Sequence, residues 1–238
     1  MLTKTQRLLL IEVIAFVGIF YLLVYFRLPL PQYVGHGYMI VCGYILPFWM
    51  NGKPKPWAEK IAWMKHQAKS IHIQVFYGIA VAILSVTVYF SVYYLLVKIM
   101  AVDVSMGFKN WQYVTPDLLL PFIRRLISVA VCEEIFFRYY LDDRLGSLIH
   151  NDIIRLLLAA TIFSLVHWGN VLKGGDSAAE IAISVITAIG YPFFYHFVFG
   201  FCRTKIKHFT LFSCMVGHFI SNVIGQMVVT IKFDFLLS

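Results

Sequence analysis

The stretch that decides the fold is AVCEEIFFRYYLDD, residues 130–143. It places the adjacent Glu133 and Glu134, followed by Arg138, in a run that is otherwise as apolar as a membrane segment. A charged group inside a membrane costs about 2.5–3.5 kcal/mol on insertion scales, so it needs a partner or a water-filled cavity. Glu134 and Arg138 are four residues apart, which puts them on one face of a helix and lets them pair. Glu133 is rotated by about 100° from Glu134, so it has no such local partner.

The composition of the chain is that of a multi-pass membrane protein. Of its 238 residues, 60% are hydrophobic and only 13% are charged, and the mean hydropathy is +0.77. Soluble domains have about 45–50% apolar and about 25% charged residues, so that class is excluded. Seven apolar runs lie near residues 8–26, 38–50, 71–98, 118–141, 153–172, 180–201 and 209–232. Because the runs are continuous, we predict an all-α, polytopic membrane helical bundle with seven to eight transmembrane helices.

The positive charge of the chain indicates an orientation in the membrane. The net charge is +8, but the basic residues gather in loops, so we expect a lipid bilayer as partner and no nucleic acid. A seven-span topology places most of them on one face: Lys4, Arg7, Lys53, Lys55, Lys60, Lys65, Lys69, Arg144, Arg155, Arg203, Lys205 and Lys207. The other face receives Arg27, Lys98, Lys109, Lys173 and Lys232. The positive-inside rule then predicts a cell-membrane protein with a cytoplasmic N-terminus and an external C-terminus.

Two further features limit the class of protein. The basic start and apolar run of residues 1–20 lack a signal-peptide cleavage site, and Glu12 interrupts the run, so we predict a retained first helix in which Glu12 pairs or reaches the interface. The four cysteines have no paired spacing, which favours small buried side chains over a disulfide framework or a zinc ribbon.

Three more polar residues in apolar runs are candidates for a site. His167 ends one run, and His218 and Asn222 share a helix face in the last run. Either histidine alone is equally well explained by a hydrogen bond between helices. Together with the unpaired Glu133, on three separate spans, these residues can build a polar cavity. It would hold a base, two groups able to bind a metal or an oxyanion, and an amide donor.

The depths of these residues set a condition on such a cavity. At 1.5 Å per residue from the cytoplasmic ends of their runs, Glu133 and His218 lie roughly 12–14 Å deep, and His167 roughly 21 Å. A shared cavity therefore requires the helix before His167 to begin later, to tilt or to be broken. The sequence has no HExxH motif, no GxSxG motif and no phosphate-binding glycine loop, so the common soluble hydrolase and nucleotide sites are not indicated.

The order of these residues resembles the CPBP family of intramembrane proteases. This family includes the type II CAAX prenyl endopeptidases and the bacterial Abi proteins, some of them linked to bacteriocin self-immunity. The three motifs are the Glu-Glu-x-x-x-Arg of 133–138, the Phe-x-x-x-His of 163–167 and the His-x-x-x-Asn of 218–222. The resemblance covers about residues 118–228. It implies a catalytic helical core over 118–232. The apolar runs and loop charges, and not the resemblance, predict N-terminal transmembrane helices over 1–117 with a basic cytoplasmic loop at 51–70, in one membrane domain with the core.

The resemblance also implies a role for each matching residue. Glu133 would activate the hydrolytic water, and Glu134 and Arg138 would assist it or hold the site together. Asn222 would stabilise the oxyanion of a tetrahedral intermediate, as an amide donor can. The two histidines would either bind a metal or polarise water and substrate. Glu133, His167 and His218 form a plausible three-ligand zinc set, and a metal-free mechanism is equally open.

The implied function is an intramembrane endopeptidase that hydrolyses a peptide bond in a peptide or membrane-anchored substrate. Whether that substrate is prenylated, and whether the protein forms oligomers, the sequence leaves open. The alternative is a non-proteolytic membrane interaction protein of the same fold, such as a bacteriocin self-immunity factor or a regulatory scaffold. A transporter that uses Glu133 as a proton carrier is a third hypothesis, and the lack of an inverted repeat argues against it.

Overall fold

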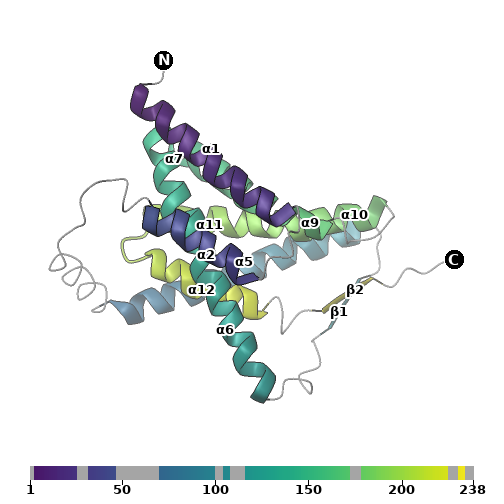
Figure 1. The fold of residues 1–238 in the computed structure, drawn as a ribbon. Helices are drawn as coiled ribbons and strands as arrows, with labels where there is room; N and C mark the ends of the chain where they lie inside the picture. The colour runs from purple at the N-terminus through teal and green to yellow at the C-terminus, as the bar shows by residue number, and fades with distance from the viewer. Residues whose placement is uncertain are drawn as a thin grey trace.

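Helices make up nearly all of the structure, a computed structural model that describes residues 3–25, 32–46, 70–99, 104–107, 116–171, 178–224 and 230–233 (Figure 1). The helices are α1 (Lys4–Tyr25), α2 (Gln32–Ile40), α5 (Ile71–Ile99), α6 (Pro116–Glu133), α7 (Asp142–Leu148), α8 (Asp152–Leu165), α9 (Trp168–Val171), α10 (Ala178–Val185), α11 (Tyr191–Lys205) and α12 (Leu211–Val223). Within these ranges, three π-helical segments continue α-helices: η1 (Val41–Ile45), η3 (Glu134–Leu141) and η4 (Ile186–Gly190). The strands β1 (Val104–Gly107) and β2 (Thr230–Phe233) form a small sheet.

Each of the seven predicted apolar runs contains helix, so the prediction of a helical protein is confirmed. Among the described residues, three helical stretches are long and apolar enough to cross a membrane, namely Lys4–Val24, Ile71–Leu96 and Ile181–Lys205. Val34–Ile45 and Leu211–Val223 are apolar but shorter. A count of seven or eight spans stays a prediction. The basic loop at 51–70 lies almost entirely outside the described residues.

The last apolar run is not helical to its end, which corrects the expectation of helix throughout. Helix α12 stops at Val223, and Thr230–Phe233 pairs antiparallel with Val104–Gly107. The register places Val104 opposite Phe233 and Gly107 opposite Thr230. The pairing segments contain valine, threonine, isoleucine and phenylalanine, whose branched and aromatic side chains suit an extended backbone.

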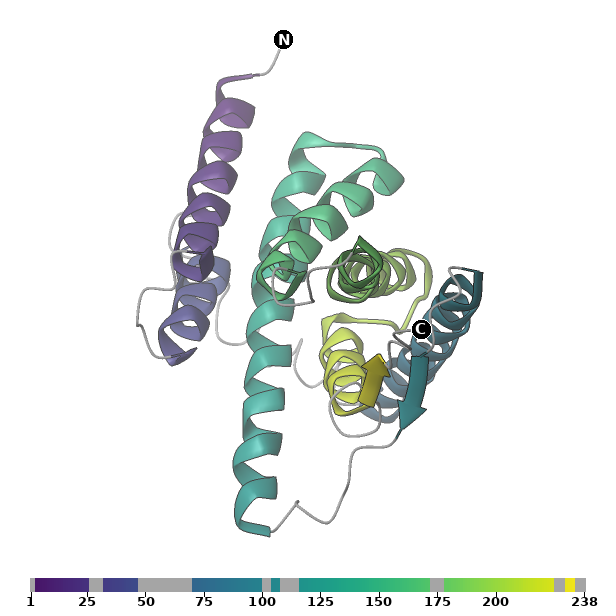
Figure 2. The same ribbon diagram turned by 90° about the vertical axis from the view of Figure 1, so that its right-hand side faces the viewer.

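One long composite helix, α6–η3–α7, organises the bundle. In Figure 2 it lies between α1 and α2 on one side and α5, α11 and α12 on the other. The buried core around it is aromatic, with the rings of Phe20 and Phe136 5.3 Å apart and those of Phe137 and Phe163 5.1 Å apart. Segment η1 approaches η3 closely at Gly43, where an added Cβ would lie 3.0 Å from the Cα of Phe136. The backbone of η3 is therefore fixed by close packing.

Helix α12 is held against α5 at a seam of small residues. An added Cβ at Gly78 would lie 2.5 Å from the carbonyl oxygen of Ser213, and one at Gly217 would lie 2.9 Å from the carbonyl oxygen of Gly78. The start of α12 is fixed by a capping box between Thr210 and Ser213. The Thr210 hydroxyl also donates a hydrogen bond to the side chain of Gln74 on α5. The seam thus sets the position of the residue after Gly217, which is His218.

We predict that Gly78→Ala destabilises the protein by about 1–3 kcal/mol, because the new methyl group meets backbone that side-chain rotation cannot move away. The matched control is Gly18→Ala on α1, where an added Cβ meets nothing within 4 Å. That change should be neutral or slightly stabilising, since alanine favours a helix over glycine by about 1 kcal/mol. Thermal unfolding of both variants in detergent measures the difference. Equal unfolding temperatures for the two variants would show that α5 and α12 do not pack closely at Gly78.

Candidate active site

A buried ion pair forms the centre of the candidate site. The predicted pairing of Glu134 and Arg138 is confirmed: Arg138 Nε donates to Glu134 Oε2, and both residues are almost fully buried. Both belong to η3, a π-helical segment of the kind that often marks a functional site inside an α-helix. The rest of the guanidinium is held by His196, through its carbonyl oxygen at 2.9 Å and its Nδ1 at 3.2 Å. Because arginine only donates, His196 Nδ1 is the acceptor.

His218 is held by the same carboxylate. Its Nδ1 lies 3.0 Å from Glu134 Oε1, and the hydroxyl of Tyr195 donates to that oxygen at 3.3 Å. A carboxylate paired with a guanidinium accepts only, so Nδ1 carries the hydrogen. In the neutral imidazole, the lone pair is then on Nε2. Glu134 therefore fixes both the tautomer and the direction of His218.

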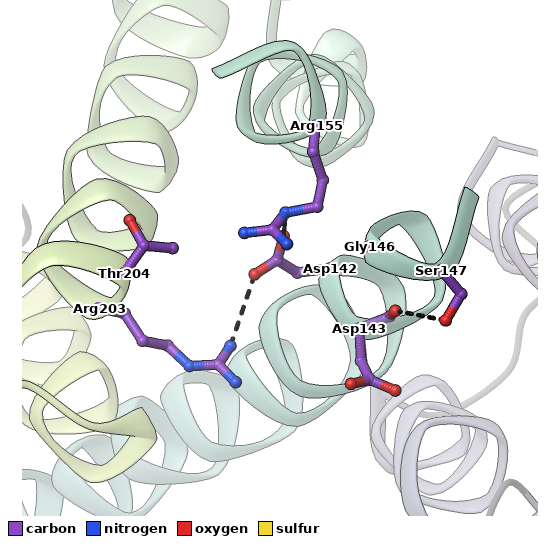
Figure 3. A pocket seen from close by; sticks show the side chains of 7 residues that line it. All are labelled: Asp142, Asp143, Gly146, Ser147, Arg155, Arg203 and Thr204. Atoms are coloured by element: carbon purple, nitrogen blue, oxygen red, sulfur yellow. Dashed lines mark hydrogen bonds and ion pairs between the residues drawn. The ribbon is translucent and has the colours of Figure 1, made fainter. Parts of the chain in front are cut away.

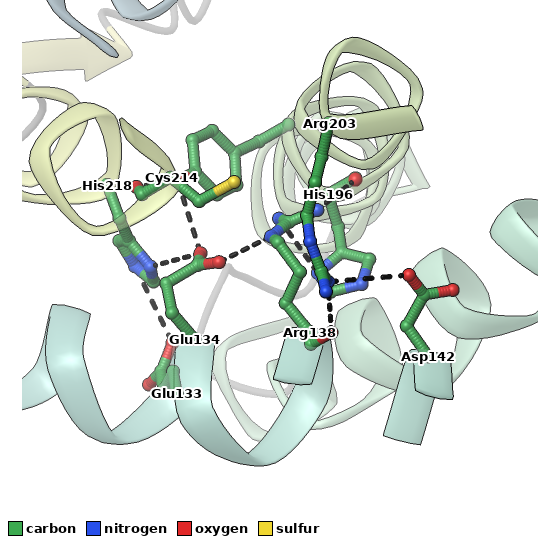
Figure 4. Close-up of polar contacts among 9 residues, drawn as sticks. Glu133, Glu134, Arg138, Asp142, His196, Arg203, Cys214 and His218 are labelled. Atoms are coloured by element: carbon green, nitrogen blue, oxygen red, sulfur yellow. Dashed lines mark hydrogen bonds and ion pairs between the residues drawn. The ribbon is translucent and has the colours of Figure 1, made fainter. Parts of the chain in front are cut away.

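The free nitrogen of His218 faces the other glutamate. His218 Nε2 lies 3.6 Å from Glu133 Oε2, which is beyond direct hydrogen-bond distance (Figure 4). The Glu133 side chain is 18% exposed, whereas that of Glu134 is only 2% exposed. Two acceptors side by side can both receive hydrogen bonds from one water molecule or one substrate group. Of the two neighbouring glutamates, Glu133 is the one that such a molecule can reach.

His167 and His218 contact the same aromatic ring, that of Phe163. Helix α8 is continuous from Asp152 to Leu165, and His167 occupies the turn before α9. A cavity shared by His167, Glu133 and His218 stays a prediction. His167 Nδ1 is 3.3 Å from the carbonyl oxygen of Phe163. The Phe163 ring lies 5.3 Å from the ring of His167 and 6.3 Å from that of His218. The ring of Phe163 thus packs against the rings of both histidines.

Asn222 and a possible metal complete the account of the expected site residues. Asn222 is half-buried on α12, one turn after His218. Within the described ranges, no three His, Cys, Asp or Glu side chains lie close enough together to hold a metal ion. Glu133 and His218 therefore supply two donors, and the third member of the expected zinc set, His167, does not join them. The residues present do not fit a three-ligand zinc site in this conformation.

Sequence reasoning missed the residues of α11 that support the ion pair. The sequence motifs do not include Tyr195 or His196, yet Tyr195 donates a hydrogen bond to Glu134 and the carbonyl oxygen of His196 accepts one from Arg138. Gly200, on the same helix, leaves room for the guanidinium, since an added Cβ would lie 3.3 Å from Arg138 Nη1. The available signal was a polar tyrosine–histidine pair inside an apolar run, because buried polar groups need partners.

A second polar cluster lies at the end of η3, around Asp142 (Figure 3). Asp142 Oδ1 is 3.0 Å from Arg155 Nε in an ion pair, although the two groups are not aligned for a hydrogen bond. Its other oxygen is 3.6 Å from Arg203 Nη1. A cavity of about 390 Å³ beside them is lined by Asp142, Asp143, Gly146, Ser147, Arg155, Arg203 and Thr204.

Other ion pairs gather at the same end of the bundle. Asp152 contacts Arg155 at 3.2 Å and Lys205 at 3.4 Å. Glu12 pairs with Arg144 at 3.1 Å, which is one of the two outcomes predicted for this residue. Basic residues that the seven-span topology assigns to one face therefore lie together. The cysteines are also as expected, since Cys42, Cys132, Cys202 and Cys214 are all free and three of them are buried.

Comparison with known proteins supports the family inferred from the motifs. Residues 115–224 match the family model described as Type II CAAX prenyl endopeptidase Rce1-like. The matched segment contains all three motifs and every residue of the candidate site. No curated protein and no solved structure matches the chain. The resemblance to the CPBP proteases is thereby confirmed over this part of the chain, and it indicates a membrane protease.

Proposed function

Because residues 115–224 carry an Rce1-like domain, we propose that the protein is an intramembrane endopeptidase that cleaves a peptide or membrane-anchored substrate. The observation that carries the proposal is the different surroundings of the two adjacent glutamates. Glu134 is buried and its oxygens are occupied by Arg138, Tyr195 and His218. Glu133 is partly exposed and faces the lone pair of His218. The chain thus has one supporting carboxylate and one that is accessible to water.

In the proposed reaction, Glu133 is the general base. A water molecule donates hydrogen bonds to Glu133 Oε2 and His218 Nε2, which orients its oxygen towards the scissile carbonyl carbon. Glu133 takes a proton as the water oxygen bonds to that carbon, and the carbonyl becomes an oxyanion. Glu133 then gives the proton to the departing amine as the C–N bond breaks, so no net proton is gained. Proton transfer of this kind contributes about 10²–10⁴ to the rate.

Two other residues act on the substrate in this proposal. Among the described residues, the side-chain amide of Asn222 makes no hydrogen bond, and it lies one helix turn from His218. It can donate to the oxyanion, where a preorganised donor is most effective. His167, which packs against the ring of Phe163, is assigned to polarising the substrate near the scissile bond. We propose the metal-free form, because the part of the chain that the structure describes brings no third ligand to Glu133 and His218.

The experiment that tests the proposal is cleavage of a peptide library by purified protein in detergent. The wild type is compared with Glu133→Ala and His218→Ala, and products are identified by mass spectrometry. We expect both variants to lose cleavage by about 10²-fold or more. Metal content is measured on the same samples, and dialysis against a chelator should leave the wild-type rate unchanged.

The control and the alternative use the same preparation. Glu12→Ala removes a carboxylate that pairs with Arg144, far along the chain from the site, and should cleave like the wild type. If Glu133→Ala and His218→Ala process every substrate at wild-type rates, the protein is not this protease. A cellular phenotype that persists in Glu133→Ala would instead favour the non-proteolytic scaffold or immunity factor.

A further inference from the structure

Arg203 contacts the backbone of η3 and not the side chains of the candidate site. It is located on α11 and its Nη1 donates to the carbonyl oxygen of Arg138 at 2.5 Å. The same nitrogen lies 3.6 Å from Asp142 Oδ2, at the start of α7. Figure 4 shows Arg203 reaching the Arg138 backbone on the side away from Glu133 and His218. Its two partners lie on either side of the place where the π-helix ends.

The junction between η3 and α7 explains why a donor is needed there. The N–H of Asp142 bonds to the carbonyl of Phe137, which is the last i→i+5 bond of the π-segment. A helix that changes from i→i+5 to i→i+4 bonding has one more carbonyl than it has N–H groups to pair with. Arg138 follows Phe137, so its carbonyl lies at this change. A buried carbonyl without a partner costs about 1–3 kcal/mol.

Helix α11 therefore binds both the side chain and the backbone of Arg138. His196 binds the guanidinium, and Arg203, seven residues later on the same face of α11, binds the carbonyl. The guanidinium in turn fixes Glu134, and Glu134 fixes the ring of His218. If η3 changed from i→i+5 to i→i+4 hydrogen bonds, its residues would rotate about the helix axis. Both glutamates would then move relative to α12.

We propose that Arg203 is a positioning residue that stabilises the π-helical form of η3 by capping the Arg138 carbonyl, and so holds Glu133 and Glu134 against His218. Its ion pair with Asp142 is secondary. The cap acts on the geometry of the site and touches no substrate. This inference concerns the placement of the two glutamates, so it can be tested whether or not a substrate is known.

Arg203→Met, Arg203→Lys and the control Lys205→Met test the cap. Lys205 is on the same helix, is half exposed and pairs with Asp152, so its removal changes the charge equally without touching η3. Hydrogen–deuterium exchange of peptides covering 133–142 should be faster by on the order of tenfold in Arg203→Met. The ¹³C-labelled ring signal of His218, assigned with His218→Gln, should shift in the same variant. Arg203→Lys keeps a donor and should restore most of both properties, and Lys205→Met should match the wild type.

A double-variant comparison separates the cap from the ion pair. If the carbonyl cap matters, Arg203→Met has its full effect on exchange and on the His218 signal in an Asp142→Asn background. If the effect of Arg203→Met disappears in that background, or if the His218 signal does not move, the proposal is overturned. Because both readouts need no substrate, a wild type that cleaves nothing would refute the proposed function and leave this test intact.

Discussion

Glu133→Gln is expected to lower the cleavage rate by about 10²–10⁴ while leaving the fold intact. Glutamine keeps the size of the side chain but cannot take a proton from water. The stability should change by less than about 0.5 kcal/mol, because the Glu133 carboxylate is partly exposed and its contact with His218 is long, at 3.6 Å. Initial rates on an identified peptide and detergent-induced unfolding measure the two effects separately.

The adjacent glutamate supplies the matched comparison. Glu134→Gln is the same chemical change one residue later, but it leaves the buried Arg138 without a counter-charge. It should therefore lose stability by about 3–5 kcal/mol as well as activity. If both variants lose stability equally, or if Glu133→Gln retains wild-type turnover, the division of roles between the two residues is wrong.

Arg138→Met is expected to destabilise the protein by about 3–5 kcal/mol, as much as Glu134→Gln, because it breaks the same buried ion pair. The buried Glu134 carboxylate would be left with Tyr195 and His218 but no cation. Methionine fills much of the vacated space, so the loss reports mainly the charge and only in small part a cavity. Unfolding in graded mixtures of mild and denaturing detergents gives the difference in free energy.

Two further variants test the physical reason for that loss. The double variant Glu134→Gln/Arg138→Met leaves no unpaired buried charge and should recover most of the stability but not the cleavage. Arg144→Met breaks the ion pair with Glu12, which solvent reaches more easily, and should cost less. A single Arg138→Met variant as stable as the wild type would mean that water enters the site and solvates Glu134.

The sequence was sufficient for features that depend on local spacing. The Glu134–Arg138 pair follows from a separation of four residues, and the helices follow from continuous apolar runs. The unpaired state of Glu133 within its own helix was predicted by the same argument. Pairing of Glu12 was expected from its position in an apolar run, although the partner, Arg144, is 132 residues away and could not be named.

The features that the sequence did not predict depend on contacts between helices. The order of residues along α11 does not indicate that His196 binds the guanidinium of Arg138 and that Arg203 binds its backbone carbonyl oxygen. The π-helical bonding of η3 is also invisible to an analysis that assumes 3.6 residues per turn. The second role of Glu134, orienting His218, appears only once α12 is packed against η3.

The separation of the partners along the chain has a consequence for biosynthesis. Glu134 and Arg138 can pair as soon as their helix forms, because both belong to one turn of η3. His218 is 84 residues beyond Glu134 and is made after every other described helix has been started. A nascent chain thus carries a neutralised ion pair from an early stage but no complete Glu133–His218 pair. Any chemistry that needs both side chains therefore requires α12 to be synthesised and docked against η3 first.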